Sequence, residues 1–109
     1  MSADLPSIVA AFVNGRYNVS EHGSVAMEDD AITTELLEQA LGFDVPEVIE
    51  DDPLDERGPC CLILGWTAQN NRPIHACVGY GGSEPLVITT YRPDLSPSRW
   101  EPDFRNRRR

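Results

Sequence analysis

Two strand-like runs near the C-terminal end of the chain constrain its fold most, residues 72–80 (RPIHACVGY) and 86–94 (LVITTYRPD). A Gly81-Gly82-Ser83 turn lies between them, and two β-forming runs joined by a glycine turn predict a β-hairpin. Because side chains alternate along a strand, we expect His75 and Cys77 to lie on one face. The opposite face then carries Ile74, Ala76, Val78 and Tyr80. A titratable ring on a small, otherwise apolar sheet is the strongest candidate for chemistry in this sequence.

The segments before the hairpin predict helices first and strands afterwards. Apolar periodicity and capping residues indicate helices over 5–13 and 33–41, and a weaker acidic helix follows His22. Strands are expected over 16–20, 45–50 and 60–66. Helices followed by a meander of antiparallel strands are typical of an α+β fold.

The length of 109 residues fits one compact domain. We expect residues 1–15 to form an N-terminal helical extension. Residues 16–109 are then a single α+β domain with an arginine-rich C-terminal tail. No stretch approaches the roughly 20 apolar residues that span a bilayer, so no membrane association is expected.

The cysteines and the N-terminus predict a cytoplasmic protein. Cys60, Cys61 and Cys77 are odd in number, and their spacing fits neither a disulfide framework nor a zinc site. We therefore expect reduced, structural thiols. The first residues also lack the basic-then-apolar pattern of a secretion signal.

Charge is distributed unevenly along the chain, which has a formal net charge of −9. All nine basic residues are arginine; residues 18–56 hold thirteen acidic side chains and no arginine, and 92–109 hold six arginines and three acids. An acidic chain repels phosphate backbones, so DNA binding is not expected. A local arginine cluster remains able to hold an RNA segment, a protein partner or a second copy, and the simplest alternative is a solvated acidic surface with a solubilising tail.

A series of landmarks resembles the family called domain of unknown function 4258. The series runs in order over about residues 16–109: Tyr17-Asn18-Val19-Ser20-Glu21-His22, Met27, Ile32, Leu36 to Leu41, Cys61-Leu62-Ile63-Leu64-Gly65, Arg72-Pro73-Ile74-His75, Val87-Ile88-Thr89-Thr90-Tyr91-Arg92-Pro93-Asp94, Trp100 and the terminal arginines.

The resemblance implies a member of the barnase/RelE-like group of small RNA-cleaving folds. In that group an N-terminal helical half packs on a sheet of about four antiparallel strands, and the substrate lies across the sheet. The implied function is a toxin-like, metal-independent endoribonuclease of a toxin–antitoxin type system, which needs no cofactor and has RNA as its substrate.

Two departures from the family pattern predict reduced activity. Ala26 and Asp30 stand where the family usually has arginine. RNA cleavage without metal needs a base, an acid and a cation against the developing phosphorane charge. Replacing two cations by a neutral and an acidic residue weakens the third requirement.

The candidate catalytic residues are His22, His75 and Tyr91. Both histidines fall at motif positions, and a converging pair would serve as general base and general acid. The ordinary alternatives are a helix-capping His22 and a hydrogen-bonded structural His75. For Tyr91 the choice is between proton donation or base stacking and packing against Trp100.

The candidate substrate-binding residues are Arg92, Arg99 and Arg105. The carboxylates Glu28, Asp29 and Asp30 are not expected to bind metal, because adjacent helical side chains diverge. The competing hypothesis is a non-catalytic interaction module on the same fold. It would use the acidic 18–56 surface and Arg107 to Arg109 to bind an antitoxin-like partner or another copy.

Overall fold

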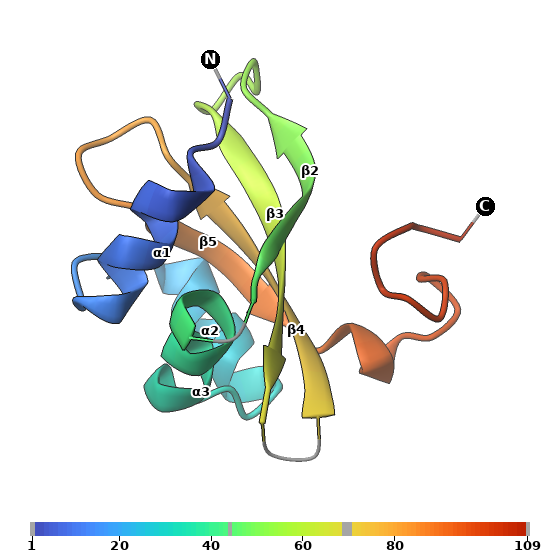
Figure 1. Ribbon diagram of the computed structural model, residues 1–109. Helices are drawn as coiled ribbons and strands as arrows, with labels where there is room; N and C mark the ends of the chain where they lie inside the picture. Colours follow the sequence, from blue (N-terminus) through green and yellow to red (C-terminus); the bar gives the residue numbers. More distant parts are fainter. Residues whose placement is uncertain (1, 44, 69–70, 109) are drawn as a thin grey trace.

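The computed structural model describes residues 2–43, 45–68 and 71–108, which form an α+β fold (Figure 1). Its helical elements, in chain order, are α1 (Leu5–Val13), α2 (Glu21–Asp29), α3 (Thr34–Glu38), the π-helical turn η1 (Gln39–Phe43) and the 3-10 turn η3 (Pro93–Leu95). Its strands are β1 (Asn18–Val19), β2 (Glu47–Asp52), β3 (Cys60–Thr67), β4 (Arg72–Gly79) and β5 (Leu86–Tyr91). They form one sheet in the order β1-β5-β4-β3-β2.

The sheet is mixed and has five strands, which corrects the expectation of about four antiparallel strands. β2 to β5 form the expected antiparallel meander, but β1 adds a fifth strand that runs parallel to β5. The sequence predicted a strand here but not its partner. With only two paired residues, Asn18 with Leu86 and Val19 with Val87, the pairing depends on how the chain packs rather than on a local pattern.

Each α-helix begins at a side chain that accepts a free backbone N–H. Asp4 caps α1 through the Ser7 amide, and Thr33 caps α3 through the Leu36 amide. Ser20 caps α2: its Oγ accepts the Gly23 amide at 2.9 Å and donates to the Ile88 carbonyl at 3.0 Å. The cap therefore also fixes α2 to β5.

The main apolar core lies between the helices and one face of the sheet. α1 belongs to this core, because Ile8 and Phe12 are buried in the same cluster as Ile63 of β3 and Val87 of β5. Three residues of β4, Ile74, Ala76 and Val78, face this core and Tyr80 packs against it. The predicted alternation along 72–80 is confirmed.

The other face of the sheet is covered in part by the C-terminal segment, which lies away from α1, α2 and α3 (Figure 1). Trp100 is buried against His75, and Phe104 packs edge-on against Trp66, with ring centroids 6.2 Å apart. The tail aromatics thus hold the tail to the sheet. Beyond the tail, Cys60 and Cys77 on the same face are only partly buried.

No helix within residues 2–43, 45–68 and 71–108 is long and apolar enough to cross a membrane.

Candidate active site

The site centres on a hydrogen-bonded pair of side chains from the hairpin. His75 of β4 lies directly opposite Tyr91 of β5, so both side chains point to the tail-covered face. The Tyr91 hydroxyl is 3.2 Å from Nδ1 of His75, and the two rings meet edge-on. The predicted hairpin is present, and it brings Tyr91 beside His75.

The tail closes the site over His75. The imidazole is fully buried, and its ring centroid lies 4.3 Å from that of Trp100. Its Nε2 atom is 2.8 Å from the main-chain carbonyl oxygen of Phe104. Because a carbonyl only accepts, Nε2 carries the hydrogen and donates it to Phe104. Nδ1 is then the acceptor, and it takes the hydrogen bond from the Tyr91 hydroxyl.

Burial keeps both groups of the pair uncharged. It lowers the pKa of His75 to about 4, against smaller opposing effects of the Phe104 carbonyl and of Glu50. Burial also raises the pKa of Tyr91 to about 12. At neutral pH the pair is therefore a neutral imidazole and an intact phenol, and the shared proton stays on the Tyr91 oxygen.

Two surface hollows meet at Tyr91, and Tyr91 and Arg107 line both. The first, of about 480 Å³, has Arg92, Arg99 and Trp100 in its wall. The second, of about 530 Å³, lies over the open part of the sheet, where its lining includes Cys60, Leu62, Cys77, Thr89 and carboxylates of β2. A substrate that crosses this face of the sheet would pass the Tyr91 hydroxyl.

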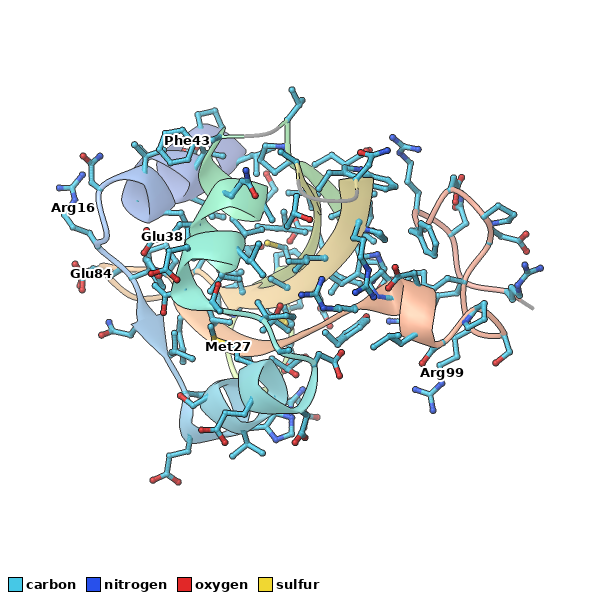
Figure 2. All side chains as sticks on the ribbon, turned by 90° about the horizontal axis from the view of Figure 1, so that it is seen from below. Arg16, Met27, Glu38, Phe43, Glu84 and Arg99 are labelled. Carbon is cyan, nitrogen blue, oxygen red and sulfur yellow. The ribbon has the colours of Figure 1, made fainter. Side chains whose placement is uncertain are left out.

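Arg99 is the candidate arginine that is free to bind a substrate. Its exposed side chain points away from the sheet on the tail side (Figure 2). Within the part of the chain that the structure describes, its guanidinium has no hydrogen bond or ion pair. It is also close enough to Tyr91 to favour the phenolate slightly.

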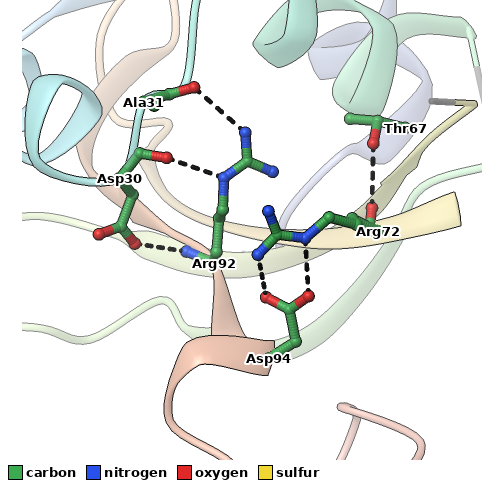
Figure 3. Close-up of polar contacts among 6 residues, drawn as sticks. All are labelled: Asp30, Ala31, Thr67, Arg72, Arg92 and Asp94. Atoms are coloured by element: carbon green, nitrogen blue, oxygen red, sulfur yellow. Dashed lines mark hydrogen bonds and ion pairs between the residues drawn. The ribbon is translucent and has the colours of Figure 1, made fainter. Parts of the chain in front are cut away.

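Arg92 is instead bound to the end of α2 (Figure 3). Its guanidinium donates to the carbonyls of Asp30 at 2.8 Å and Ala31 at 3.1 Å, and its amide donates to the Asp30 carboxylate at 2.7 Å. Asp30, at a position where the family pattern has arginine, therefore joins α2 to the end of β5. The neighbouring Arg72–Asp94 ion pair, bidentate at 2.9 Å, holds η3 to β4.

Arg105 and Arg107 are both paired with glutamates of β2. Arg105 Nε lies 2.7 Å from Glu47, and Arg107 binds Glu50 through two contacts of 2.7 and 3.0 Å. Arg107 also lies over the Trp100 ring, 4.8 Å from its centroid. The expected substrate contact of Arg105 thus competes with an ion pair within the chain. Arg109, which was expected in the same cluster, lies outside the described residues.

The two histidines are not brought together. His22 lies exposed in the first turn of α2. Met27 of the same helix packs into the core on the helical side of the sheet (Figure 2). His75 lies on the other side of the sheet, so one active site cannot contain both rings.

The thiols at the second hollow are poor nucleophiles. Cys60 and Cys77 are hydrogen-bonded neighbours, and all three cysteines are free. Burial raises the pKa of Cys77 to about 11 and, with Asp55, also raises that of Cys60. Because the thiolate is the reactive form, these values disfavour cysteine chemistry.

Glu50 and the Phe104 carbonyl were not predicted from the sequence. A main-chain carbonyl gives no sequence signal, and Glu50 stood among many acidic residues. The described residues contain no group of three metal-ligating side chains that would hold an ion.

Comparison with known proteins identifies one family model, "Domain of unknown function (DUF4258)", which matches residues 19–92. This is shorter than the expected resemblance over 16–109, and the tail that covers His75 lies outside it. Searches of curated proteins and of solved structures found no match.

Proposed function

The chain belongs to the domain of unknown function 4258 family, and we propose that it is a toxin-like, metal-independent endoribonuclease in a low-activity form. The observation that carries the proposal is the Tyr91–His75 hydrogen bond at the junction of two hollows, beside the unpaired Arg99. The proposal includes the barnase/RelE-like character of the fold, RNA as substrate and a cytoplasmic setting.

Cleavage would proceed by attack of the ribose 2′-hydroxyl on the adjacent phosphorus. Nε2 of His75 takes the 2′ proton, the 2′-oxygen–phosphorus bond forms, and the bond to the 5′-oxygen breaks. Tyr91 gives its proton to that leaving oxygen, so the products are a 2′,3′-cyclic phosphate and a 5′-hydroxyl. Nδ1–H of His75 then returns a proton to the Tyr91 oxygen, and Nε2 gives up the 2′ proton to water while Nδ1 takes one from water, which restores the starting tautomer. Arg99 stabilises the charge on the phosphorane, which is the cation that the reaction requires.

In the proposed mechanism the closed arrangement of His75, Tyr91 and Phe104 is inactive, because Nε2 already carries a hydrogen that it donates to Phe104. Nε2 then has no free lone pair for the 2′ proton, and burial, which lowers the pKa of His75 to about 4, disfavours protonation at Nδ1. The Tyr91 proton is directed at Nδ1 rather than at a substrate. Catalysis requires the other tautomer, in which Nδ1–H donates to the Tyr91 oxygen.

The test is cleavage of RNA in the presence of EDTA, with cyclic phosphate ends as the product measured. We expect Tyr91→Phe and Arg99→Gln each to lower the rate by about 100-fold, the scale of one general acid or one charge-stabilising group. The matched controls are His22→Ala and Arg16→Gln. Arg16 is the exposed counterpart of Arg99 and lies at the opposite end of the molecule (Figure 2). Equal rates for Tyr91→Phe and the controls would refute the assignment.

The second candidate is the interaction module, and it is favoured by α2. Glu21, Glu28 and Asp29 are exposed on this helix, and within the described chain their carboxylates have no partner. Such a face fits a basic protein partner. The tail part of this hypothesis is not favoured, because Arg107 and Arg108 are paired with Glu50 and Glu101. Binding that weakens with salt and is lost in Glu21→Gln/Glu28→Gln would support the module.

A further inference from the structure

The end of the tail is built as a small closed loop over His75. We call residues 101–108 the strap. The Glu101 amide donates to the Asn106 carbonyl at 2.8 Å, the Phe104 amide donates to the Glu101 carbonyl at 2.9 Å, and Trp100 forms a β-bridge with Arg107. These bonds join the strap into one compact loop that begins directly after Trp100.

The strap presents its Phe104 carbonyl to His75 at some conformational cost. Phe104 has a φ of 58°, in the left-handed region that is uncommon for a residue other than glycine. Its ring makes an edge contact with Trp66, and its carbonyl reaches Nε2 of His75. Strain at the residue that seals the imidazole favours a strap that can open.

At its end the strap is tied to the residues beside Trp100, because the Arg108 amide donates to the Arg99 carbonyl at 2.9 Å and Nε of Arg108 donates to the Pro97 carbonyl at 2.8 Å. Its attachments to β2 are ion pairs at the surface. Arg105 and Arg107 hold it to Glu47 and Glu50 of β2, and all four side chains are partly exposed. Exposed ion pairs contribute little to stability and are screened by salt. Trp100, by contrast, is buried on His75, while η3 is held by Arg72 and Asp94. If the strap leaves the sheet at residue 101, Trp100 and η3 therefore stay in place and keep Arg99 beside Tyr91.

From this geometry we infer that the strap is an autoinhibitory element, which locks His75 in the tautomer that cannot act as a base at Nε2. The inhibitory role of the strap rests on the proposed function, whereas its opening can be measured without RNA. When the strap opens, Nε2 loses its acceptor and becomes accessible. Nδ1–H can then donate to the Tyr91 oxygen, and the Tyr91 proton is freed for the substrate. Arg105 and Arg107 also lose their glutamates and become available to phosphate.

The strap can be tested without RNA, because the chain has only two histidines. Diethyl pyrocarbonate labels accessible neutral imidazoles, and exposed His22 serves as the internal reference. In the parent we expect His75 to label at least 100-fold more slowly than His22. In Glu47→Lys/Glu50→Lys, which repels the strap, we expect His75 labelling to rise at least 10-fold with His22 unchanged.

The matched control is Glu21→Lys/Glu28→Lys, which makes the same charge change on α2 and should leave His75 protected. Adding Arg105→Glu/Arg107→Glu to the β2 variant restores both ion pairs with reversed sign and should restore protection. A salt titration of the parent requires no mutation and should accelerate labelling of His75 alone.

The outcomes separate the two proposals. Faster His75 labelling together with faster RNA cleavage in the β2 variant supports both. Faster labelling without any cleavage supports the strap and overturns the ribonuclease proposal. Equal labelling of His75 in the parent, in the β2 variant and at high salt overturns the strap, whatever the cleavage result.

Discussion

His75 is the central residue of the candidate site, because β5 and the C-terminal tail both contact its side chain. Tyr91 binds Nδ1, the Phe104 carbonyl binds Nε2 and Trp100 covers the ring. Their combined effect is to bury the ring, and burial favours the neutral imidazole more strongly than the Phe104 carbonyl and Glu50 favour the charged form. The same environment that suppresses its basicity makes it a pH-dependent contributor to stability.

Acid should therefore weaken the fold through His75. Its pKa is about 4 when folded and near 6.5 when unfolded, so the unfolded chain binds the proton first as the pH falls. The stability is fully present above pH 6.5, and about 3 kcal/mol of it is lost between pH 6.5 and 4. Denaturant unfolding measures this loss against His75→Gln, which keeps a donor to Phe104 but does not titrate. Parallel pH profiles for the two proteins would contradict the assignment.

At the scale of elements, the turn η1 packs closely against strand β3 at Gly65. A Cβ placed on Gly65 would lie 2.9 Å from the Ala40 Cβ and would meet the Ala40 carbonyl even more closely. Only glycine therefore allows η1 to lie this near the sheet. The contact fixes the helical layer on the face opposite the candidate site.

Gly65→Ala should destabilise the protein by about 3 kcal/mol, because backbone atoms of η1 must move to admit the methyl group. Gly82→Ala is the control, since its nearest neighbour, the Glu84 carbonyl, lies at an ordinary 3.8 Å. Thermal unfolding of both variants distinguishes them. A similar melting temperature for the two would show that η1 is not packed as described.

The sequence predicted the hairpin and not the strap, for a physical reason. Alternation along residues 72–80 is a local property, so it placed His75 on the correct face opposite the core. The strap depends on a main-chain carbonyl and on ion pairs between residues more than fifty positions apart. No periodic pattern encodes such contacts. For the same reason the sequence could not show that His22 and His75 lie on opposite sides of the sheet.

At the scale of the whole molecule, the uneven charge of the chain is partly resolved within the fold. The acidic strand β2 and the arginine-rich tail, far apart in sequence, pair with each other through Glu47 and Glu50. The net charge of −9 nevertheless remains, so the closed molecule repels RNA. Opening of the strap changes this locally, because it releases Arg105 and Arg107 beside Arg99. In the proposed mechanism the closed strap therefore both blocks His75 and keeps two arginines from the substrate.

The decisive experiment is cleavage of RNA in EDTA by Glu47→Lys/Glu50→Lys, with and without Tyr91→Phe in the same background. We expect the opened protein to produce 2′,3′-cyclic phosphate ends faster than the parent. We also expect Tyr91→Phe to remove about 100-fold of that rate, the contribution of one general acid. No cleavage by an opened protein in which His75 labels freely, or cleavage that Tyr91→Phe leaves unchanged, would contradict the proposed mechanism.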